Sequence, residues 1–266
     1  MKILLIAGHG GTPYDPGAVG CGYTEAVETR RMANAVAPLL RAYGFEVALY
    51  DQSKDAYKVV TQGGSLPLSG VSYVLEFHLN SAANDPKGNG RTTGTEIFVH
   101  TNEQGVTVEQ AILRRVCALG FKNRGVKRSS GLAVLKHVFN RGVSHALVET
   151  CFIDDRDDMD LYGKKFNAIA RAIADGVAEG FGKTVQDDKE DDTMTQKEFE
   201  AMYNKVNPLY KTISDVPRYW QQEVREMLDC GAINGGTAGD PDDIGMRHEA
   251  LQAAIVAYRA AVEVNK

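Results

Sequence analysis

The sequence predicts an α/β fold, in which a mostly parallel, twisted sheet has helices on both faces, followed by a small C-terminal helical module. Short β-branched segments alternate with long amphipathic segments over the first 182 residues. Parallel βαβ units produce this alternation. Strands are expected at 2–7, 45–50, 71–77, 95–100, 132–135 and 145–149, and long helices at 25–43, 103–119 and 164–181.

Two segments carry this prediction. The helix expected at 164–181 places its apolar residues on one face, and Gly182 follows it as a stop signal. These apolar residues are Phe166, Ile169, Ala170, Ile173, Val177 and Phe181. The strand expected at 71–77 is rich in β-branched and aromatic residues, which is typical of a strand buried on both faces of a parallel sheet.

Composition limits the class of protein. The chain has 266 residues, of which 43% are hydrophobic, and a net charge of −5. The negative charge and the lack of a basic stripe give no reason to expect a nucleic-acid partner. Neither a signal peptide nor a membrane-spanning segment is visible. The four cysteines form no CxxC pair. We therefore expect synthesis in a reducing cytoplasm and no membrane insertion.

An uneven charge distribution predicts a domain boundary. Residues 190–266 hold 14 acidic and 8 basic side chains, so 21 of the chain's 35 acids and 22 of its 30 bases precede them. Five acids lie among the six residues 187–192, and such a run stays solvated. We expect a first domain at 1–182, an acidic linker at 183–193 and a helical module at 194–266.

Four titratable residues stand where predicted elements begin or end. His9 and His78 each follow an apolar strand, Glu149 closes the strand expected at 145–149, and Glu25 follows a glycine-rich loop. Binding sites of open α/β sheets lie beyond the carboxyl ends of the strands, so these side chains are expected to face one crevice.

The set has the composition of a catalytic zinc site. Two imidazoles and one carboxylate, here His9, His78 and Glu25, bind zinc with a fourth position left to water. Zinc lowers the pKa of that water to about 7 and polarises a carbonyl oxygen, as cleavage of an unactivated amide requires. A second carboxylate must carry the proton to the leaving amine, and Glu149 is the candidate.

Each of these residues also has a purely structural interpretation. Either imidazole could hydrogen-bond a loop, Glu149 could be an ion-pair partner, and Glu25 could be a solvated acid in the first turn of a helix. Glu28 is a close rival of Glu25 as the carboxylate ligand. The structural interpretation needs four separate coincidences, which favours the zinc site.

The motifs resemble those of the zinc-dependent N-acetylmuramoyl-L-alanine amidases of the type 3 family. The resemblance covers about residues 1–182 and rests on GHGGTPYDPGAVGCGYTEAVETRRMANAVAPLLRAYGFEV, FHLNSA, GTEIFVH, NRGVKRSSGLAVLKH and ALVETCFIDDRDD. It implies that His9, Glu25 and His78 bind zinc and that Glu149 is the catalytic acid/base. Glu25 is preferred to Glu28 because it keeps the family's spacing to the AYG turn.

The implied reaction is hydrolysis of the amide between N-acetylmuramic acid and the L-alanine of the stem peptide in bacterial peptidoglycan. Residues expected to position this substrate are Asn80, Thr150, Gly10 and Gly11. The insertion-like stretch NDPKGNGRTTG adds Lys87 and Arg91 as possible contacts. His137 and His145 are expected in the core or on the surface rather than at the metal, and Cys21 is not needed as a ligand.

The tail predicts two helices. The first is expected after a cap at Ser214 or Asp215, with Pro217 in its first turn, and Gly231 ends it. The GAINGG turn and the segment MRHEALQAA resemble surface-layer-homology-like modules that attach to cell-wall polymers. Self-association through Trp220, Tyr258 and their neighbours is expected. The acids at 240, 242 and 243 are expected in a solvated turn, because their spacing does not fit a calcium loop.

An amidase with a wall-binding tail and no export signal resembles a bacteriophage endolysin. Such a protein is made in the host cytoplasm and acts on the wall, here of a Gram-positive host, after release. The alternatives are a host-encoded autolysin and a non-catalytic wall-binding protein that retains the amidase fold. A dinucleotide-binding enzyme is disfavoured, because the loop GHGGTPYDPGAVG lacks GxGxxG at a helix start.

Overall fold

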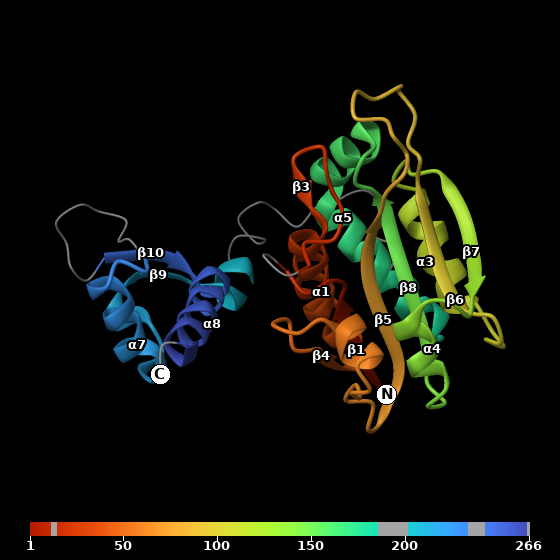
Figure 1. Ribbon diagram of the computed structural model, residues 1–266. Coiled ribbons are helices and arrows are strands. Elements are labelled where there is room, and N and C mark those ends of the chain that lie inside the picture. The colour runs from red at the N-terminus through yellow and green to blue at the C-terminus, as the bar shows by residue number, and fades with distance from the viewer. Residues whose placement is uncertain (12–14, 186–201, 234–242, 265–266) are drawn as a thin grey trace. The chain divides into compact units, whose positions relative to one another are not determined.

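The computed structural model describes residues 1–11, 15–185, 202–233 and 243–264, and the chain divides into two compact units, Met1–Gln186 and Asp187–Lys266 (Figure 1). Most of the expected linker at 183–193 lies outside the described residues, as do Asp240 and Asp242. Within the described ranges, no helix is long and apolar enough to cross a membrane.

The first unit is built on a six-stranded sheet in the order β4-β1-β5-β8-β6-β7. All neighbouring strands are parallel except β6 and β8, which pair antiparallel. The mostly parallel sheet is therefore confirmed. The strands are β1 (Lys2–Ala7), β4 (Glu46–Leu49), β5 (Val71–Asn80), β6 (Thr95–His100), β7 (Asn123–Ser129) and β8 (Ser144–Phe152); β2 (Val19–Gly20) and β3 (Tyr23–Thr24) form a separate small hairpin.

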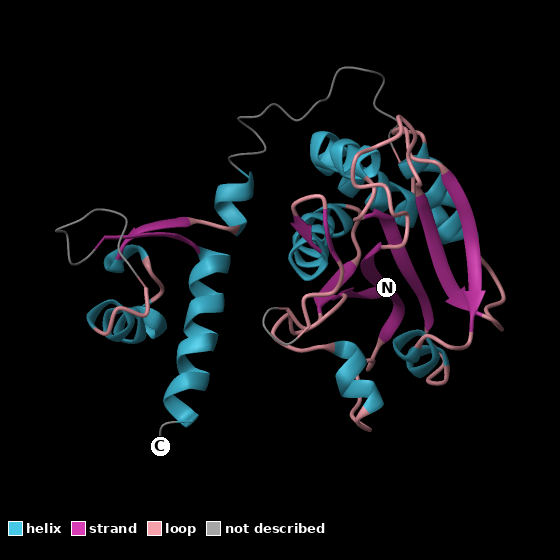
Figure 2. Ribbon diagram, turned by 45° about the horizontal axis from the view of Figure 1, so that its top comes forward, coloured by secondary structure: helices cyan, strands magenta, loops and turns pink. Residues whose placement is uncertain are grey.

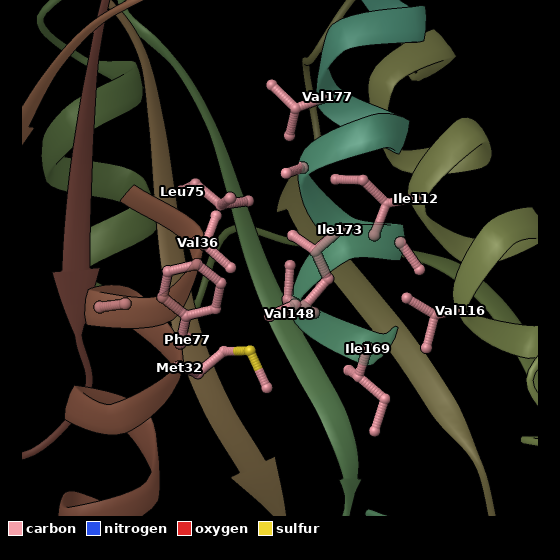
Figure 3. Packing of buried hydrophobic residues seen from close by; sticks show 14 of the residues in the cluster. Met32, Val36, Leu75, Phe77, Ile112, Val116, Val148, Ile169, Ile173 and Val177 are labelled. Atoms are coloured by element: carbon pink, nitrogen blue, oxygen red, sulfur yellow. The ribbon is translucent and has the colours of Figure 1, made fainter. Parts of the chain in front are cut away.

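Helices cover both faces of the sheet, as predicted (Figure 2). They are α1 (Glu25–Ala42), α2 (Ala56–Thr61), α3 (Thr107–Cys117), α4 (Ala133–Phe139) and α5 (Arg156–Gly180). Alternate residues of each strand face opposite layers. Leu75 and Phe77 of β5 therefore join the larger core with α1, α3 and α5 (Figure 3), whereas Val74 joins the smaller core with α2 and α4.

Three expectations for this unit are wrong in detail. The apolar run at 132–135 is not a strand, because it enters α4. The strand β7 was not expected, because it lies at the edge of the sheet and its residues, NRGVKRS, do not alternate between polar and apolar. The helix expected at 164–181 matches the part of α5 that follows a kink at Lys165, but the expectation missed the preceding part, which begins at Arg156. There the side chain of Asp155 accepts a hydrogen bond from the backbone N–H of Asp158 and caps α5.

The crossing of α3 and α5 depends on a glycine. A Cβ added to Gly176 would lie 2.5 Å from Cα of Ile112, and backbone atoms cannot move aside cheaply. Overpacking of this kind costs about 1–3 kcal/mol, so we expect Gly176→Val to lower the free energy of unfolding by that amount. Chemical denaturation measures the change. Gly131→Val is the control, because its Cβ would meet only the Ser129 hydroxyl at 3.8 Å; equal stability of both variants would contradict the prediction.

The second unit contains a two-stranded antiparallel sheet as well as helices, which corrects the purely helical description. Strand β9 (Leu209–Thr212) pairs with β10 (Asp243–Arg247), and the helices are α7 (Arg218–Asp229) and α8 (His248–Val264). The expected cap at Ser214 or Asp215 instead lies in a 3-10 turn, Ile213–Asp215, and Pro217 caps α7. The small core includes Trp220, Val224, Met227, Leu251 and Ile255.

Candidate metal and catalytic site

The turn after β1 fixes the first histidine. His9 adopts a left-handed backbone conformation with φ of 67°, which costs free energy for a residue with a side chain. Two side chains of α1 hold this turn. The guanidinium of Arg30 donates to the carbonyl of His9 at 3.0 Å, and the hydroxyl of Thr29 donates to the carbonyl of Gly8 at 2.9 Å. The strained conformation is thus held by hydrogen bonds from a rigid helix.

The second histidine and the candidate acid are neighbours across the sheet. His78 lies within β5, and the strand register pairs it with Glu149 of β8. The backbone N–H of Gly8 donates to the carbonyl of Phe77 at 3.0 Å, which places the end of β1 beside the same part of β5. The β5 strand runs to Asn80, three residues beyond its expected end, so His78 sits on a paired strand rather than in a loop.

Glu25 joins the two histidines. It is the first residue of α1, only 4% exposed, and its Oε1 lies 3.1 Å from Nε2 of His9 and 2.9 Å from Nδ1 of His78. The ligand atoms of these three residues all lie within 4.8 Å of one another. Its rival Glu28 instead accepts hydrogen bonds from Tyr162 and Arg31. The structure therefore brings together the three expected ligands and leaves Glu28 outside the cluster.

The donor set fits zinc. Tetrahedral zinc with bonds of about 2.0–2.2 Å holds its ligand atoms about 3.3–3.5 Å apart, a few tenths of an ångström more than the contacts around Glu25. Burial disfavours the charged form of Glu25, but hydrogen bonds from His78 and His9 outweigh it and hold the pKa of this carboxyl well below its usual value. A carboxylate that stays ionised is a suitable metal ligand.

Each histidine also has a carboxylate on its other ring nitrogen. Nδ1 of His9 lies 3.1 Å from the carboxylate of Asp15, and Nε2 of His78 lies 3.3 Å from Oε1 of Glu76. Such outer carboxylates orient the imidazoles of metal sites. We did not expect either from the sequence. The available signal was Glu76 itself, the only acidic residue of β5, two positions before His78.

Glu149 is placed differently from Glu25. Its Oε2 is buried and has no hydrogen-bond partner among the described residues. Burial, reinforced by the nearby carboxylates of Glu25, Glu96 and Glu76 against the opposing effect of His78, raises the pKa of Glu149 to about 7. A carboxyl group with such a pKa can both accept and donate a proton near neutrality.

Comparison with known proteins assigns the chain to a family. The sequence model of the N-acetylmuramoyl-L-alanine amidases matches residues 3–179. The chain belongs to this family. It is 28% identical over 191 residues to the "Probable autolysin PH" of Staphylococcus aureus, an alignment that covers 66% of this chain and 38% of the autolysin. The chain thus spans about two fifths of that relative.

Solved structures show the same fold. The catalytic domain of the CD27L endolysin, described as targeting Clostridia difficile, matches with a TM-score of 0.54 and 24% identity, over 70% of this chain and 99% of that domain. The catalytic domain of the amidase CwlV from Bacillus (Paenibacillus) polymyxa var. colistinus matches with a TM-score of 0.54 and 20% identity, over 69% of this chain and 99% of that domain.

The residues expected to position substrate lie in different environments. Thr150 is 2% exposed, and its carbonyl accepts a hydrogen bond from Thr95 at 2.7 Å. The pairing of β5 with β8 is irregular between His78 and Asn80, so strand alternation does not fix which side of the sheet Thr150 faces. At 2% exposure, however, Thr150 offers almost no surface to a substrate, which speaks against the expected contact. Asn80 donates to Glu96 at 2.7 Å and stays partly exposed.

The glycine-rich turn and the stretch after β5 are ordered by backbone contacts. Gly11 adopts φ of 86° and bridges to Asp15, and a Cβ on Gly10 would lie 3.0 Å from Cβ of Asp55.

In the stretch NDPKGNGRTTG, Lys87 and Arg91 are exposed. The carboxylate of Asp157 accepts hydrogen bonds from the backbone of residues 89–91, and that of Asp154 from residues 82–84. The acidic segment at the start of α5 thus shapes the loop beside the site.

The remaining candidates are not part of the cluster. His137 and His145 do not belong to it, and His145 is buried at 2% exposure. Cys21 also lies outside it, and burial raises the pKa of its thiol, which disfavours the thiolate that a metal would need.

The close approach of Gly8 to His78 yields a prediction. A Cβ on Gly8 would lie 2.3 Å from Cε1 of His78, so Gly8→Ala must displace the imidazole. We expect zinc affinity to fall by about 10–100-fold, the range for losing a group that orients a metal ligand. Competition titration with a chelator measures it. Gly105→Ala, whose Cβ meets nothing within 4 Å, should keep the affinity of the unaltered protein; unchanged affinity in Gly8→Ala would contradict the prediction.

Proposed function

We propose that this chain is a zinc-dependent hydrolase that cleaves the amide between N-acetylmuramic acid and the L-alanine of the peptidoglycan stem peptide. One observation carries the proposal: two imidazole nitrogens and a carboxylate oxygen lie within 4.8 Å of one another, beside the carboxyl group of Glu149, whose Oε2 is buried. The family supplies the substrate class, and its members generally depend on zinc.

The geometry of the site supports the following roles. His9, Glu25 and His78 would hold the zinc, which supplies Lewis-acid polarisation of the amide carbonyl and activation of water. Glu149 takes a proton from the attacking water and delivers it to the nitrogen of the leaving L-alanine. Its raised pKa suits both transfers, because one group must be a base in the first and an acid in the second.

Identifying which bond of the cell wall is broken tests the proposal. The full chain, loaded with zinc, is incubated with purified cell walls, and the soluble products are analysed for new termini. We expect free amino termini of L-alanine without new reducing sugars. Release of reducing ends, or amino termini of another residue, would assign a different bond, and no release by zinc-loaded protein would remove the proposed activity.

We propose that the second unit, Asp187–Lys266, anchors the enzyme to wall polymers. It has a core of its own around Trp220 and Leu251, separate from the core of the first unit. Its resemblance to surface-layer-homology-like modules supplies the ligand class. Such modules act in sets, so self-association through the neighbourhood of Trp220 and Tyr258 would raise avidity for a repetitive wall.

Separate fragments test the anchor. We expect residues 187–266 to pellet with walls without cutting them, and residues 1–186 to cut soluble wall fragments, since the four site residues lie within it. Wall sedimentation and product analysis measure both, and analytical ultracentrifugation reports self-association. If residues 187–266 stay in the supernatant while the full chain pellets, the second unit is not the anchor.

We further propose an endolysin role, in which the protein stays in the host cytoplasm until the membrane is perforated. Support comes from the resemblance to endolysins and from the fold match to the CD27L catalytic domain. Expression in a Gram-positive host, with and without a membrane-perforating agent, tests it. Lysis only after perforation is expected, whereas lysis without perforation would favour an autolysin that reaches the wall unaided.

A further inference from the structure

Polar side chains of β5 and β8, among them Glu76 and His145, lie next to the candidate metal site. The register pairs Val74 with His145 and His78 with Glu149, so alternate residues of β5 and β8 lie on one face of the sheet. Glu76 lies on that same face, and it is 3% exposed. The surrounding layer is the smaller hydrophobic core, built from residues such as Val74 and Ile6.

Glu76 contacts two imidazoles at once. Its Oε1 lies 3.3 Å from Nε2 of His78, in hydrogen-bond geometry, and its Oε2 lies 3.1 Å from Nε2 of His145, a close contact without that geometry. A carboxylate buried in an apolar layer is costly unless charged or hydrogen-bonding groups compensate it. A hydrophobic residue at this position could not accept a hydrogen bond from an imidazole nitrogen, which points to a specific role for Glu76.

The contact with His78 sets which nitrogen faces the metal. A carboxylate can only accept hydrogen bonds, so Oε1 of Glu76 keeps the ring hydrogen on Nε2. Nδ1, which lies 2.9 Å from Oε1 of Glu25, is then the nitrogen that would give up its hydrogen and present a lone pair when zinc binds. His9 has the opposite arrangement, with Nδ1 on Asp15 and Nε2 beside Glu25. The two ligands therefore present different nitrogens, each fixed by its own carboxylate.

We propose that Glu76 is the positioning residue that orients His78 for zinc, and that His145 acts through Glu76 by its close contact with the second oxygen. The inference rests on the proposed zinc site. Glu76 differs from the other orienting carboxylate in burial: the side chain of Asp15 is 28% exposed and open to water, whereas that of Glu76 is 3% exposed. Solvent cannot replace Glu76, so its loss leaves the His78 ring free to rotate.

Zinc binding to the full chain tests the proposal. We expect the zinc dissociation constant, measured by competition with a chelator, to rise by about 10–100-fold in Glu76→Leu. Glu76→Gln keeps the shape and one acceptor oxygen, so its rise should be smaller. In zinc-loaded protein, the Nε2 proton of His78 should give a downfield NMR resonance that is lost in Glu76→Leu.

Glu109→Leu is the matched control. Glu109, a residue of α3, is also buried at 3% exposure. It accepts a hydrogen bond from Tyr73, which lies on β5 as Glu76 does but faces the opposite side of the sheet. We expect this variant to change stability and leave the zinc dissociation constant unchanged. The proposal would be overturned if the zinc dissociation constant rose equally in Glu109→Leu and Glu76→Leu, or if it rose in neither Glu76 variant.

A double-mutant cycle tests the role of His145. If His145 acts through Glu76, His145→Leu weakens zinc binding in the unaltered background and has no further effect in Glu76→Leu. Additive effects would overturn this part. Failure of the zinc proposal itself is distinguishable, because then the unaltered protein would bind no zinc, whereas failure of the present inference leaves the unaltered protein and the Glu76 variants binding zinc equally.

Discussion

Glu149→Gln is expected to keep zinc while lowering wall hydrolysis by about 10²–10⁴-fold, the usual contribution of a general acid/base. The amide has nearly the shape of the carboxyl group but cannot take up and return the proton. Glu149 pairs with His78 across the register and is not one of the three proposed ligands, so its replacement should remove no donor from zinc. Turnover and zinc binding should therefore separate.

The measurement pairs zinc stoichiometry with the rate of amino-terminus release from walls. Glu28→Gln is the matched control, since Glu28 is another buried acid of the same unit whose carboxylate faces Tyr162 and Arg31 instead of the cluster. It should retain turnover. Near-normal turnover in Glu149→Gln would transfer the acid/base role to another group, and loss of zinc would make Glu149 a ligand.

The residues that make the cluster could be predicted because of where they stand on the chain. A parallel sheet brings the carboxyl ends of its strands together, so His9 and His78 converge although 69 positions separate them. Glu25 could be placed near them because it begins the helix that follows the first strand. These positions depend on strand order and helix starts, which apolar patterns predict well.

The edge of the sheet could not be predicted from the same patterns. Strand β7 has only one neighbour and is partly exposed, so it does not need an apolar sequence. The run LAVL at 132–135 is apolar because α4 packs it against the smaller core. A short apolar run does not distinguish a strand from a buried helix.

The contacts of the outer carboxylates could not be predicted without knowing the strand register. Whether Glu76 contacts His145 depends on how β5 and β8 align, and a shift by one residue would turn Glu76 to the other face. The burial of Thr150 could not be predicted either, because it depends on the strands that flank β8.

Removing a metal ligand should have a different signature from removing the acid/base. In His78→Ala, zinc and turnover should be lost together, because His78 is one of the three proposed ligands and its Nδ1 lies 2.9 Å from Oε1 of Glu25. We expect zinc affinity to fall by more than the roughly 10–100-fold associated with outer carboxylates. Chelation of the unaltered protein should likewise abolish wall hydrolysis, and added zinc should restore it, whereas zinc should not rescue His78→Ala at the same concentration.

His137→Ala is the control for this loss. His137 belongs to the same unit but lies outside the cluster, so its replacement should change neither zinc stoichiometry nor turnover. Zinc content and wall hydrolysis are measured for the unaltered protein, His78→Ala and His137→Ala. Stoichiometric zinc in His78→Ala would remove His78 from the ligand set. Loss of zinc in both variants would instead indicate that zinc binding responds to the fold of the whole unit and not specifically to the side chain of His78.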